Sequence, residues 1–345
     1  MYYERVLTSK SDLKQREYIL ASRGLRAPGS EDIIYGLFDS CDRLAATGSL
    51  VRNIIQGVAV REEYDGEGLT AKILTLILRH ASERGLRHLF LFTTANSAPR
   101  FASLGFRTVG ATASSALLEW GRPGMEEFLA GLAELAETAG SGICDASCVV
   151  VNCNPFTLGH RYLIEQAAAA SGRLYALVVK EDISEFPFDV RLRLVSEGVS
   201  DIGNVIVASG GDYAVSGATF PSYFTREEDL ASAHAELDLE IFASKIAPVL
   251  RVTRRFAGEE PFSGITRVYN QIMKRVLPPR GIQVTELKRL EIRGEPVSAS
   301  RVRRFLGEGR IEEARELVPS RTRFFFETPE FESVLKSIAE KQSRQ

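Results

Sequence analysis

Apolar and polar residues follow two alternating patterns in the second half of the chain. Short apolar runs, typical of buried strands, are separated by stretches with apolar residues at helical spacing. We predict strands over 148–152, 174–179 and 204–208, and helices from about 159 and over 189–199. Strands that alternate with helices favour an α/β fold with a parallel, doubly wound, Rossmann-like sheet, in which ligands bind beyond the carboxyl ends of the strands.

The first half of the chain has a different pattern. It predicts a strand over Asn53–Arg61, a helix over Glu67–Glu83 and a strand over Leu86–Thr93. This succession of elements indicates a smaller α+β domain.

A helix and a flexible break separate the two patterns. Residues 125–139 place apolar side chains on one helical face and acidic side chains on the other, and a Gly-Ser-Gly break follows at 140–142. We therefore expect a first domain, a linker helix with a hinge, and a second domain over residues 1–124, 125–142 and 143–345.

Composition and charge exclude several classes of protein. Of 345 residues, 44% are hydrophobic and 26% are charged, as in soluble globular proteins. Lys and Arg number 43 against 45 Asp and Glu, and the net charge of −2 excludes one large surface for nucleic acid. The sequence has neither a signal-peptide core nor the roughly 18 consecutive apolar residues of a membrane span. We expect a cytoplasmic protein with no membrane partner.

Three of the four cysteines, Cys144, Cys148 and Cys153, lie close together in the sequence. A metal site would need a second pair or histidines at ligand spacing, so small buried residues beside a strand are the better interpretation. We expect reduced cysteines and no bound metal.

A buried strand runs directly into a helix at residues 149–160, Val-Val-Val-Asn-Cys-Asn-Pro-Phe-Thr-Leu-Gly-His. Pro155 ends the strand, and Gly159 lets the backbone approach another group closely. His160, in the first helical turn, points the same way as free amides and the positive end of the helix dipole, which together suit a phosphate chain. The alternative is that Thr157 caps the helix and His160 is an ordinary surface residue.

A second helix start of this kind occurs at residues 297–304, Val-Ser-Ala-Ser-Arg-Val-Arg-Arg. Ser298 or Ser300 can cap the helix, while the other hydroxyl and an arginine bind phosphate oxygens. Residues 288–310 hold seven basic and three acidic side chains, an excess of +4. The alternative is a capped helix with a solvated basic face. Two such helix starts in one doubly wound domain favour the triphosphate of a nucleotide.

These motifs resemble those of a known superfamily. T-L-G-H at 157–160 and V-S-A-S-R-V-R at 297–303 are similar to the H/T-x-G-H and I-S-x-S-x-x-R motifs of nucleotidyltransferases. More narrowly, the chain resembles the citrate lyase ligase family over essentially its whole length, in N-P-F-T-L-G-H-R-Y-L at 154–163, A-T-F-P-S-Y-F at 218–224 and R-F-A-G-E-E-P at 255–261.

The first domain resembles GNAT acetyltransferases. E-Y-D-G-E-G-L at 63–69 is similar to their Q/R-x-x-G-x-G/A loop, whose backbone amides hold a coenzyme A pyrophosphate, and F-A-S-L-G-F at 101–106 supports the same fold. Glu63 replaces the usual Gln or Arg, and Asp65 and Glu67 add negative charge. We hypothesise that this domain docks a phosphopantetheine-like arm or a carrier subunit instead of transferring acetyl groups.

The resemblance implies an enzyme that acetylates the thiol of the citrate lyase acyl-carrier subunit, on its CoA-like prosthetic group, and releases AMP and pyrophosphate. It implies Mg²⁺-ATP, acetate and the carrier subunit as partners, and no tightly bound cofactor. Lys180 follows the second strand of the domain and joins His160 as a catalytic candidate, although it is equally an ordinary strand-end lysine. Arg191 and Asp182 are further candidates. The candidate nucleotide-binding residues are Asn154, Pro155, Phe156, Thr157, Gly159, His160, Ser298, Ser300 and Arg303.

Two other functions fit the same residues. A nucleotidyltransferase that joins ATP to pantetheine phosphate or nicotinamide mononucleotide would use both phosphate motifs but form a dinucleotide and no AMP. A GNAT acetyltransferase whose C-terminal domain senses nucleotide would consume acetyl-CoA without ATP.

Overall fold

The chain folds into two compact units, Met1–Glu127 and Phe128–Gln345. The computed structural model describes residues 2–25, 32–138, 140, 145–181, 184–217, 219, 228–260 and 263–342. The helix predicted over residues 125–139 is present as α4, Met125–Thr138, and most of it belongs to the second unit. Ser141 and Gly142 of the predicted hinge lie outside the described residues, and the domain limits stay a prediction.

The first unit is built on a seven-stranded sheet in the order β1-β2-β3-β4-β5-β7-β6. Strands β4 and β5 pair in parallel, and the other neighbours are antiparallel. The strands are β1 Tyr3–Val6, β2 Ile33–Phe38, β3 Leu44–Val51, β4 Ile54–Val60, β5 His88–Thr94, β6 Arg107–Ala111 and β7 Ser115–Gly121. The helices are α1 Lys10–Ser22, η1 Glu62–Tyr64, α2 Leu69–Glu83 and α3 Ala98–Ala102.

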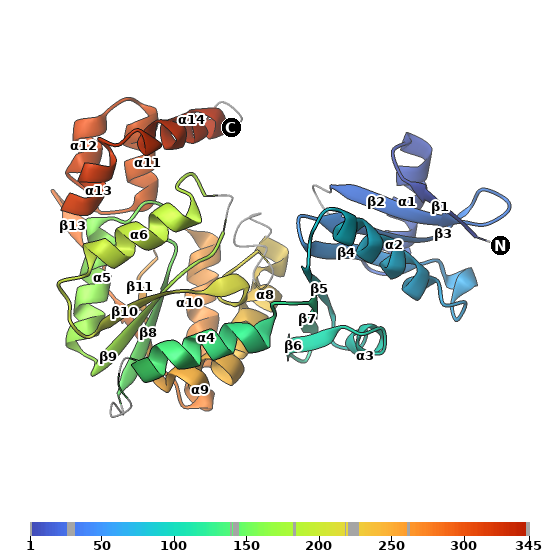
Figure 1. Ribbon diagram of the computed structural model, residues 1–345, viewed down its shortest axis with the longest axis horizontal. Helices are drawn as coiled ribbons and strands as arrows, with labels where there is room; N and C mark the ends of the chain where they lie inside the picture. The colour runs from blue at the N-terminus through green and yellow to red at the C-terminus, as the bar shows by residue number, and fades with distance from the viewer. Residues whose placement is uncertain are drawn as a thin grey trace. The chain divides into compact units, whose positions relative to one another are not determined.

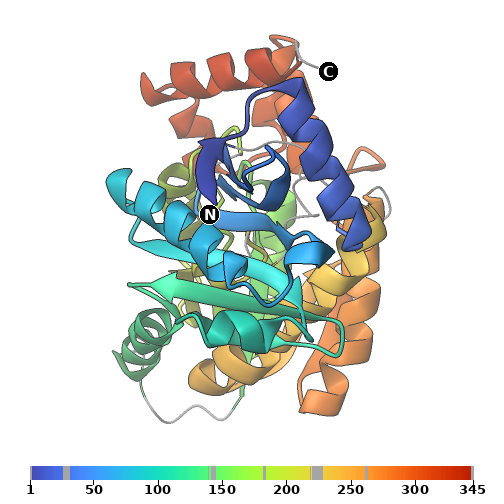
Figure 2. The same ribbon diagram turned by 90° about the vertical axis from the view of Figure 1, so that its right-hand side faces the viewer.

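Two apolar clusters hold this unit together, one on each face of the sheet. Helix α2 buries Leu69, Ile73 and Ile77 against one face. Helix α1 buries Ile19 and Leu20 against the other. Figure 2 shows the two helices on opposite sides of the strands. The predicted α+β plan is confirmed.

The second unit contains the predicted parallel sheet. Its five strands lie in the order β10-β9-β8-β11-β12, and every neighbouring pair is parallel. The strands are β8 Ala146–Val151, β9 Arg173–Val178, β10 Val205–Ser209, β11 Val252–Gly258 and β12 Gln283–Leu287. The chain runs outward from β8 to β10 and then returns to the other side of β8. The direction of winding therefore reverses between β8 and β11, which is where ligands bind in sheets of this kind.

Helices cover both faces of this sheet (Figure 1). The elements around it are α5 Leu158–Ala169, α6 Phe188–Gly198, η2 Gly211–Tyr213, α8 Glu228–Ile241, the π-helical turn η3 Phe242–Ile246, α9 Ala247–Leu250, α10 Gly264–Val276 and η4 Pro278–Arg280. The C-terminal part adds β13 Glu291–Ile292, β14 Glu295–Pro296, α11 Ala299–Gly307, α12 Ile311–Arg315, α13 Ser320–Phe325 and α14 Glu330–Gln342. One large cluster joins the sheet to α5, α6 and the helices from α11 onward.

Neighbouring residues of β11 face opposite sides of the sheet, as the strand geometry requires. Phe256 packs in the cluster with α5 and α6. Arg255 points to the other face, where it donates to the Tyr269 hydroxyl at 2.8 Å and lies 4.3 Å from the centre of the Phe242 ring. Tyr269 in turn donates to the Asp238 carboxylate at 2.6 Å. Both faces of the sheet are therefore buried, one by apolar side chains and one partly by a polar network.

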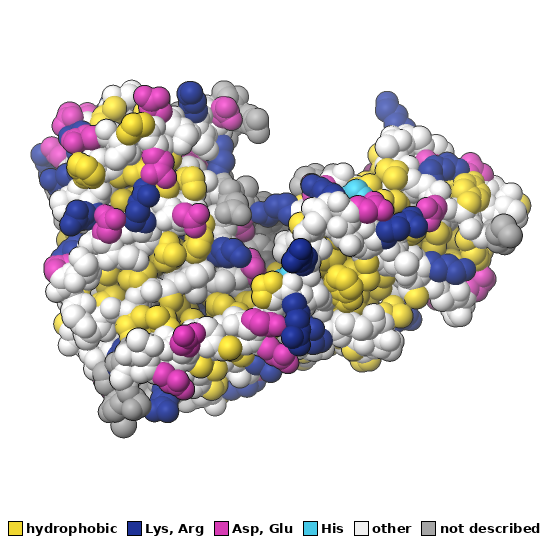
Figure 3. Space-filling view, in the orientation of Figure 1, with side chains coloured by type: hydrophobic (Ala, Val, Ile, Leu, Met, Phe, Trp, Pro, Cys, Tyr) yellow, Lys and Arg dark blue, Asp and Glu magenta, His cyan; other side chains and the backbone are white. Residues whose placement is uncertain are grey.

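Charged side chains of both signs are interspersed on the face of the second unit drawn in Figure 3. Ion pairs of this unit include Arg193–Glu330 and Arg310–Glu313. Within the part of the chain that the structure describes, no helix is long and apolar enough to cross a membrane.

Candidate active site

The segment from β8 into α5 contains the first predicted phosphate-binding motif, residues 149–160, called here the first phosphate motif. Thr157 is the N-cap of α5, and its hydroxyl accepts the amide N–H of His160 at 3.3 Å. The imidazole Nδ1 of His160 accepts the amide N–H of Thr157 at 3.1 Å. This reciprocal pair is a capping box in which histidine takes the place of the usual Glu or Gln. The structure thus confirms Thr157 as a helix cap and ties His160 to it.

The capping box also determines the state of the imidazole. Because Nδ1 accepts a hydrogen bond, the neutral ring carries its proton on Nε2. Burial, together with the positive charges of Arg289 and Arg303, lowers the pKa of His160 from 6.5 to about 4. His160 is therefore a neutral N–H donor near pH 7, with its ring stacked on Phe156 at a centroid distance of 6.2 Å.

The first turn of α5 offers fewer unpaired amides than the sequence suggests. Leu158 donates its N–H to the Leu317 carbonyl at 2.9 Å, and the His160 N–H is used in the cap. The attraction for an anion at this helix start depends more on the imidazole and the neighbouring arginines than on backbone donors.

The second phosphate motif, residues 297–304, forms the start of helix α11. Ser298 is the N-cap, and its hydroxyl accepts the Arg301 N–H at 3.2 Å. Ser300 is exposed, and its hydroxyl lies 3.5 Å from Nη2 of Arg303. The structure thus separates the two serines: Ser298 caps the helix, and the Ser300 hydroxyl faces outward beside an arginine.

The two motifs meet, although 149 positions separate Asn154 from Arg303. Nη1 of Arg303 donates to the Asn154 carbonyl. A Cβ atom on Gly159 would lie 2.9 Å from the Val297 carbonyl oxygen. Gly159 therefore allows the start of α11 to pack against the start of α5, beyond the carboxyl end of β8.

Three of the predicted nucleotide-binding residues have side chains that face the protein. Asn154 accepts the Phe186 N–H at 3.0 Å and donates to the Glu185 carboxylate at 2.5 Å. Pro155 is buried, and Phe156 is fully buried against Gly198. These side chains hold the loop in place, so contact with a ligand there is left to the backbone.

Glu185 is a member of the site that the sequence analysis missed. Its carboxylate lies 3.3 Å from Nε of Arg303 and 3.6 Å from Nζ of Lys341 on α14. Burial opposes ionisation, but the charge of Arg303 and the hydrogen bond from Asn154 keep the pKa of Glu185 below its usual value. No sequence signal marks this residue, because it lies in a loop that is distant from both motifs along the sequence, although it contacts them in space.

Two of the remaining candidates, Lys180 and Arg191, lie at the same edge of the sheet but in different settings. Lys180 follows β9 and pairs with Asp212 at 3.2 Å, on the side toward β10. Arg191 is fully buried and donates to the carbonyls of Asn152 at 2.8 Å and Val179 at 2.7 Å. Arg191 thus joins the loops after β8 and β9 and positions them. Asp182 lies outside the described residues.

The buried cysteines offer no reactive thiolate or metal ligand set. Cys148 and Cys153 are fully buried, and burial raises the pKa of each thiol well above its ordinary value. Among the residues the structure describes, no group of three or more His, Cys, Asp or Glu is placed to hold a metal ion. Cys144 lies outside that part of the chain.

The first unit carries the predicted pyrophosphate-type loop at the start of α2. Gly66 and Gly68 both have positive φ angles, of 86° and 71°, which only glycine adopts readily. The two acidic side chains beside them are paired: Asp65 with Arg23 at 2.6 Å, and Glu67 with the Tyr2 hydroxyl at 2.6 Å. The loop therefore has the glycine backbone conformation expected of a pyrophosphate-binding loop, and Arg23 compensates part of its negative charge.

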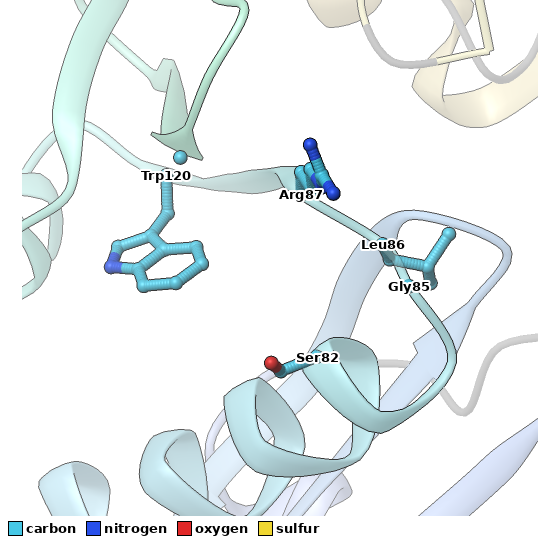
Figure 4. Close-up of a pocket in the computed structure, with 6 residues that line it drawn as sticks. Ser82, Gly85, Leu86, Arg87 and Trp120 are labelled. Atoms are coloured by element: carbon cyan, nitrogen blue, oxygen red, sulfur yellow. The ribbon is translucent and has the colours of Figure 1, made fainter.

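A hollow of about 400 Å³ lies at the opposite end of α2, lined by Ser82, Gly85, Leu86, Arg87, Trp120 and Gly121 (Figure 4). It contains no residue of either phosphate motif. The edge of the parallel sheet, where both motifs converge, is the better candidate for chemistry.

Comparison with known families finds a different match in each of the two units. The family model described as the citrate lyase ligase C-terminal domain matches residues 146–326, and that of the acetyltransferase (GNAT) family matches residues 38–106.

Two curated relatives extend over most of the chain. A citrate (pro-3S)-lyase ligase from Klebsiella pneumoniae is 39% identical over 289 residues, which are 82% of this chain and 83% of that protein. One from Haemophilus influenzae is 32% identical over 329 residues, or 93% and 97% of the two chains. Among solved structures, an N-acetyltransferase from Staphylococcus aureus is 15% identical and covers 35% of this chain and 97% of its own, with a TM-score of 0.28, which is too low to bear on the fold.

Proposed function

The chain belongs to the citrate lyase ligase family, and we propose that it uses ATP and acetate to acetylate the prosthetic-group thiol of the citrate lyase acyl-carrier subunit. The meeting of the two phosphate motifs beyond the carboxyl end of β8 supports this most directly. The arrangement suits a nucleotide triphosphate, the co-substrate of an AMP-forming ligase.

The reaction has two steps. A carboxylate oxygen of acetate attacks the α-phosphorus of Mg²⁺-ATP, the bond from that phosphorus to the bridging oxygen breaks, and pyrophosphate leaves. The carrier thiol then attacks the carbonyl carbon of acetyl-adenylate, loses its proton to solvent and displaces AMP. Neither step needs a nucleophile from the protein, so positioning and charge stabilisation carry the catalysis.

The residues at the sheet edge supply that stabilisation. Nε2–H of His160 donates to phosphate oxygens as charge builds on the departing pyrophosphate. The start of α5, with Thr157 and Gly159, holds the α- and β-phosphates. The hydroxyl of Ser300 and the guanidinium of Arg303 bind the β- and γ-phosphates, with Ser298 fixing the helix start that presents them.

Lys180 and the first unit have separate proposed roles. Lys180 offsets negative charge or receives the acetate carboxylate at the neighbouring strand end. The GNAT-like unit docks the CoA-like arm of the carrier through the glycine loop that begins α2. The positive charge of Arg23, paired with Asp65, offsets part of the repulsion such an anionic arm would meet, and the Tyr2 hydroxyl donates a hydrogen bond to Glu67.

Replacing His160 by Gln tests the central role. Glutamine can keep the capping box, because its side-chain oxygen can accept the Thr157 N–H, but its group differs from the imidazole N–H in reach and direction. We expect acetate-dependent conversion of ATP to AMP to fall roughly 10²–10³-fold, the usual effect of losing one donor to a developing anion. Turnover is measured with deacetylated citrate lyase, following AMP release and acetylation of the carrier.

The matched control is His80→Gln, the same change on α2 of the first unit. Circular dichroism and the melting temperature verify that both variants fold. Wild-type turnover by a folded His160→Gln protein would contradict the assigned role. Formation of a dinucleotide without AMP would favour a nucleotidyltransferase, and consumption of acetyl-CoA without ATP would favour an acetyltransferase.

A further inference from the structure

An arginine that neither motif contains lies beside the meeting point of the two motifs. Arg289 follows β12 by two residues, at the carboxyl end of the sheet. Next to it, the Leu290 carbonyl accepts the Val297 N–H at 2.9 Å. The carbonyl oxygen of Val297 is the atom that packs closely against Gly159. Arg289 therefore belongs to the segment that packs directly onto the start of α5.

The loop after β11 holds the Arg289 side chain. Nε donates to the Glu259 carbonyl at 2.6 Å, and Nη2 pairs with the Glu260 carboxylate. The Arg289 side chain is 24% exposed and that of Glu260 is 12% exposed. The backbone supports the same arrangement, because the Glu259 N–H donates to the Leu287 carbonyl at 2.9 Å. The ends of β11 and β12 thus hold one guanidinium at the carboxyl edge of the sheet, next to the point where its winding reverses.

A second arginine at the site is held in the same way. Arg303 is 26% exposed and pairs with Glu185, which is 15% exposed. Each arginine comes from the C-terminal part of the chain, and each carboxylate comes from a loop that follows a strand of the sheet. Burial is the main cause of the lowered pKa of His160, and the positive charges of Arg289 and, to a smaller extent, Arg303 lower it further. His160 thus lies within the electrostatic reach of both guanidinium groups.

We propose that Arg289 is a further triphosphate-binding residue of this site, acting together with Arg303, and that Glu260 is the positioning residue that aims it. The inference rests on the proposed function, because it takes ATP as the ligand.

The chemistry of the ligand explains why two held arginines are needed. A triphosphate carries several negative charges on closely spaced oxygens, and the planar guanidinium fork matches phosphate geometry in two contacts at once. A guanidinium has five N–H donors, so Arg289 can keep its contact with Glu260 while other donors reach a phosphate. In the absence of nucleotide, each paired carboxylate neutralises part of the charge of its arginine. It also fixes the orientation of the guanidinium before the nucleotide binds.

Residues of the R-F-A-G-E-E-P segment at 255–261 have two different roles under this proposal. Its first residue, Arg255, lies in the buried network on the far face of the sheet. Its second glutamate, Glu260, holds Arg289 at the site. Strand β11 thus contributes Arg255 to the interior, and the loop that follows it contributes Glu260 to the proposed nucleotide site.

Binding of ATP and of AMP to the full-length chain tests the proposal. We expect Arg289→Gln to weaken ATP binding roughly 10- to 100-fold, the usual effect of losing a charge-assisted contact, and to leave AMP binding within about 3-fold of wild type. The matched control is Lys288→Gln, which removes the same charge one residue earlier from an exposed side chain and should leave both affinities unchanged. Isothermal titration calorimetry in Mg²⁺ measures the dissociation constants.

Glu260→Gln and Glu260→Asp test the positioning role. We expect Glu260→Gln to weaken ATP binding by a smaller factor than Arg289→Gln and to raise KM for ATP more than it lowers kcat. Glu260→Asp should recover part of the affinity. A purely structural pair would weaken ATP and AMP binding equally.

The outcomes separate this inference from the proposed function. If the wild-type chain binds no ATP, the proposed function fails. If the wild type binds ATP and folded Arg289→Gln binds it equally well, or loses AMP binding to the same extent, the role given to Arg289 is overturned.

Discussion

His160 combines a structural contact with the proposed chemistry. Its Nδ1 accepts the Thr157 N–H in a capping box, and this contact leaves the ring proton on Nε2, the atom that we propose as the donor to phosphate. A neutral donor suits this place, because a protonated imidazole would have to lie close to two arginines.

The acidity of the histidines predicts how stability depends on pH. Burial, with the charges of Arg289 and Arg303, lowers the pKa of His160 from 6.5 to about 4, and burial also lowers the pKa of His234 from 6.5 to about 4. The unfolded chain therefore takes up protons as pH falls through about 6.5, while the folded chain does so only near pH 4. Stability should be full above pH 6.5 and fall as pH drops from 6.5 toward 4.

Urea unfolding of wild type and His160→Gln at pH 7 and pH 5 checks this expectation. The free energy of unfolding of the second unit should fall between the two pH values, and it should fall less in the variant, because one of the two histidines is gone. Identical losses in both proteins would show that His160 keeps an ordinary pKa.

Gly159 is required for a contact between segments, and this makes a second prediction. A Cβ atom at this position would lie 2.9 Å from the Val297 carbonyl oxygen, so Gly159→Ala must push α11 away from α5. We expect a loss of stability of about 1–3 kcal/mol, as for other overpacked sites, together with weaker ATP binding.

Gly203→Ala is the matched control. Gly203 has an ordinary φ angle and nothing within 4 Å of an added Cβ, so this change should alter stability by no more than about 1 kcal/mol and leave ATP binding intact. Equal effects of the two substitutions would refute the packing role of Gly159.

Helix starts carry most of the site, and the two serines of α11 divide the work. Ser298 caps the helix and Ser300 is exposed next to Arg303. We expect Ser298→Ala to destabilise the protein by about 0.5–2 kcal/mol, the usual cost of losing an N-cap. We expect Ser300→Ala to leave stability unchanged and to weaken ATP binding. Thermal unfolding and calorimetric titration distinguish the two effects, and a reversed pattern would exchange the roles of the serines.

Secondary structure was predictable where apolar spacing was regular. The strands β8, β9 and β10 and the helices α5 and α6 lie within about two residues of their predicted positions, because buried parallel strands are continuous apolar runs. Strand β11 was missed because its sequence, VTRRFAG, has two adjacent arginines. Arg255 is nevertheless buried, since Tyr269 accepts its hydrogen bond and the Phe242 ring covers it. A polar residue with a tertiary partner leaves no apolar signal.

The molecule has two units with separate apolar cores, which the change in pattern along the sequence already indicated. Its overall charge of −2 says little about the ligand. Arg289 and Arg303, the arginines of the proposed site, are each paired with a half-buried carboxylate, Glu260 and Glu185, so part of the positive excess of residues 288–310 is offset by acidic side chains from other segments.

Local spacing along the chain was sufficient for the α/β class, the parallel sheet and both helix starts, and the resemblance of short motifs to those of known proteins indicated the family. These follow from periodicity and short motifs, which depend on neighbouring residues. Spacing could not show that Val297 closes on Gly159, that Arg303 reaches the Asn154 carbonyl, or that Glu185 and Glu260 hold the two arginines. Those contacts join segments up to 149 positions apart, and they exist because the winding of the sheet brings several strand ends to one edge.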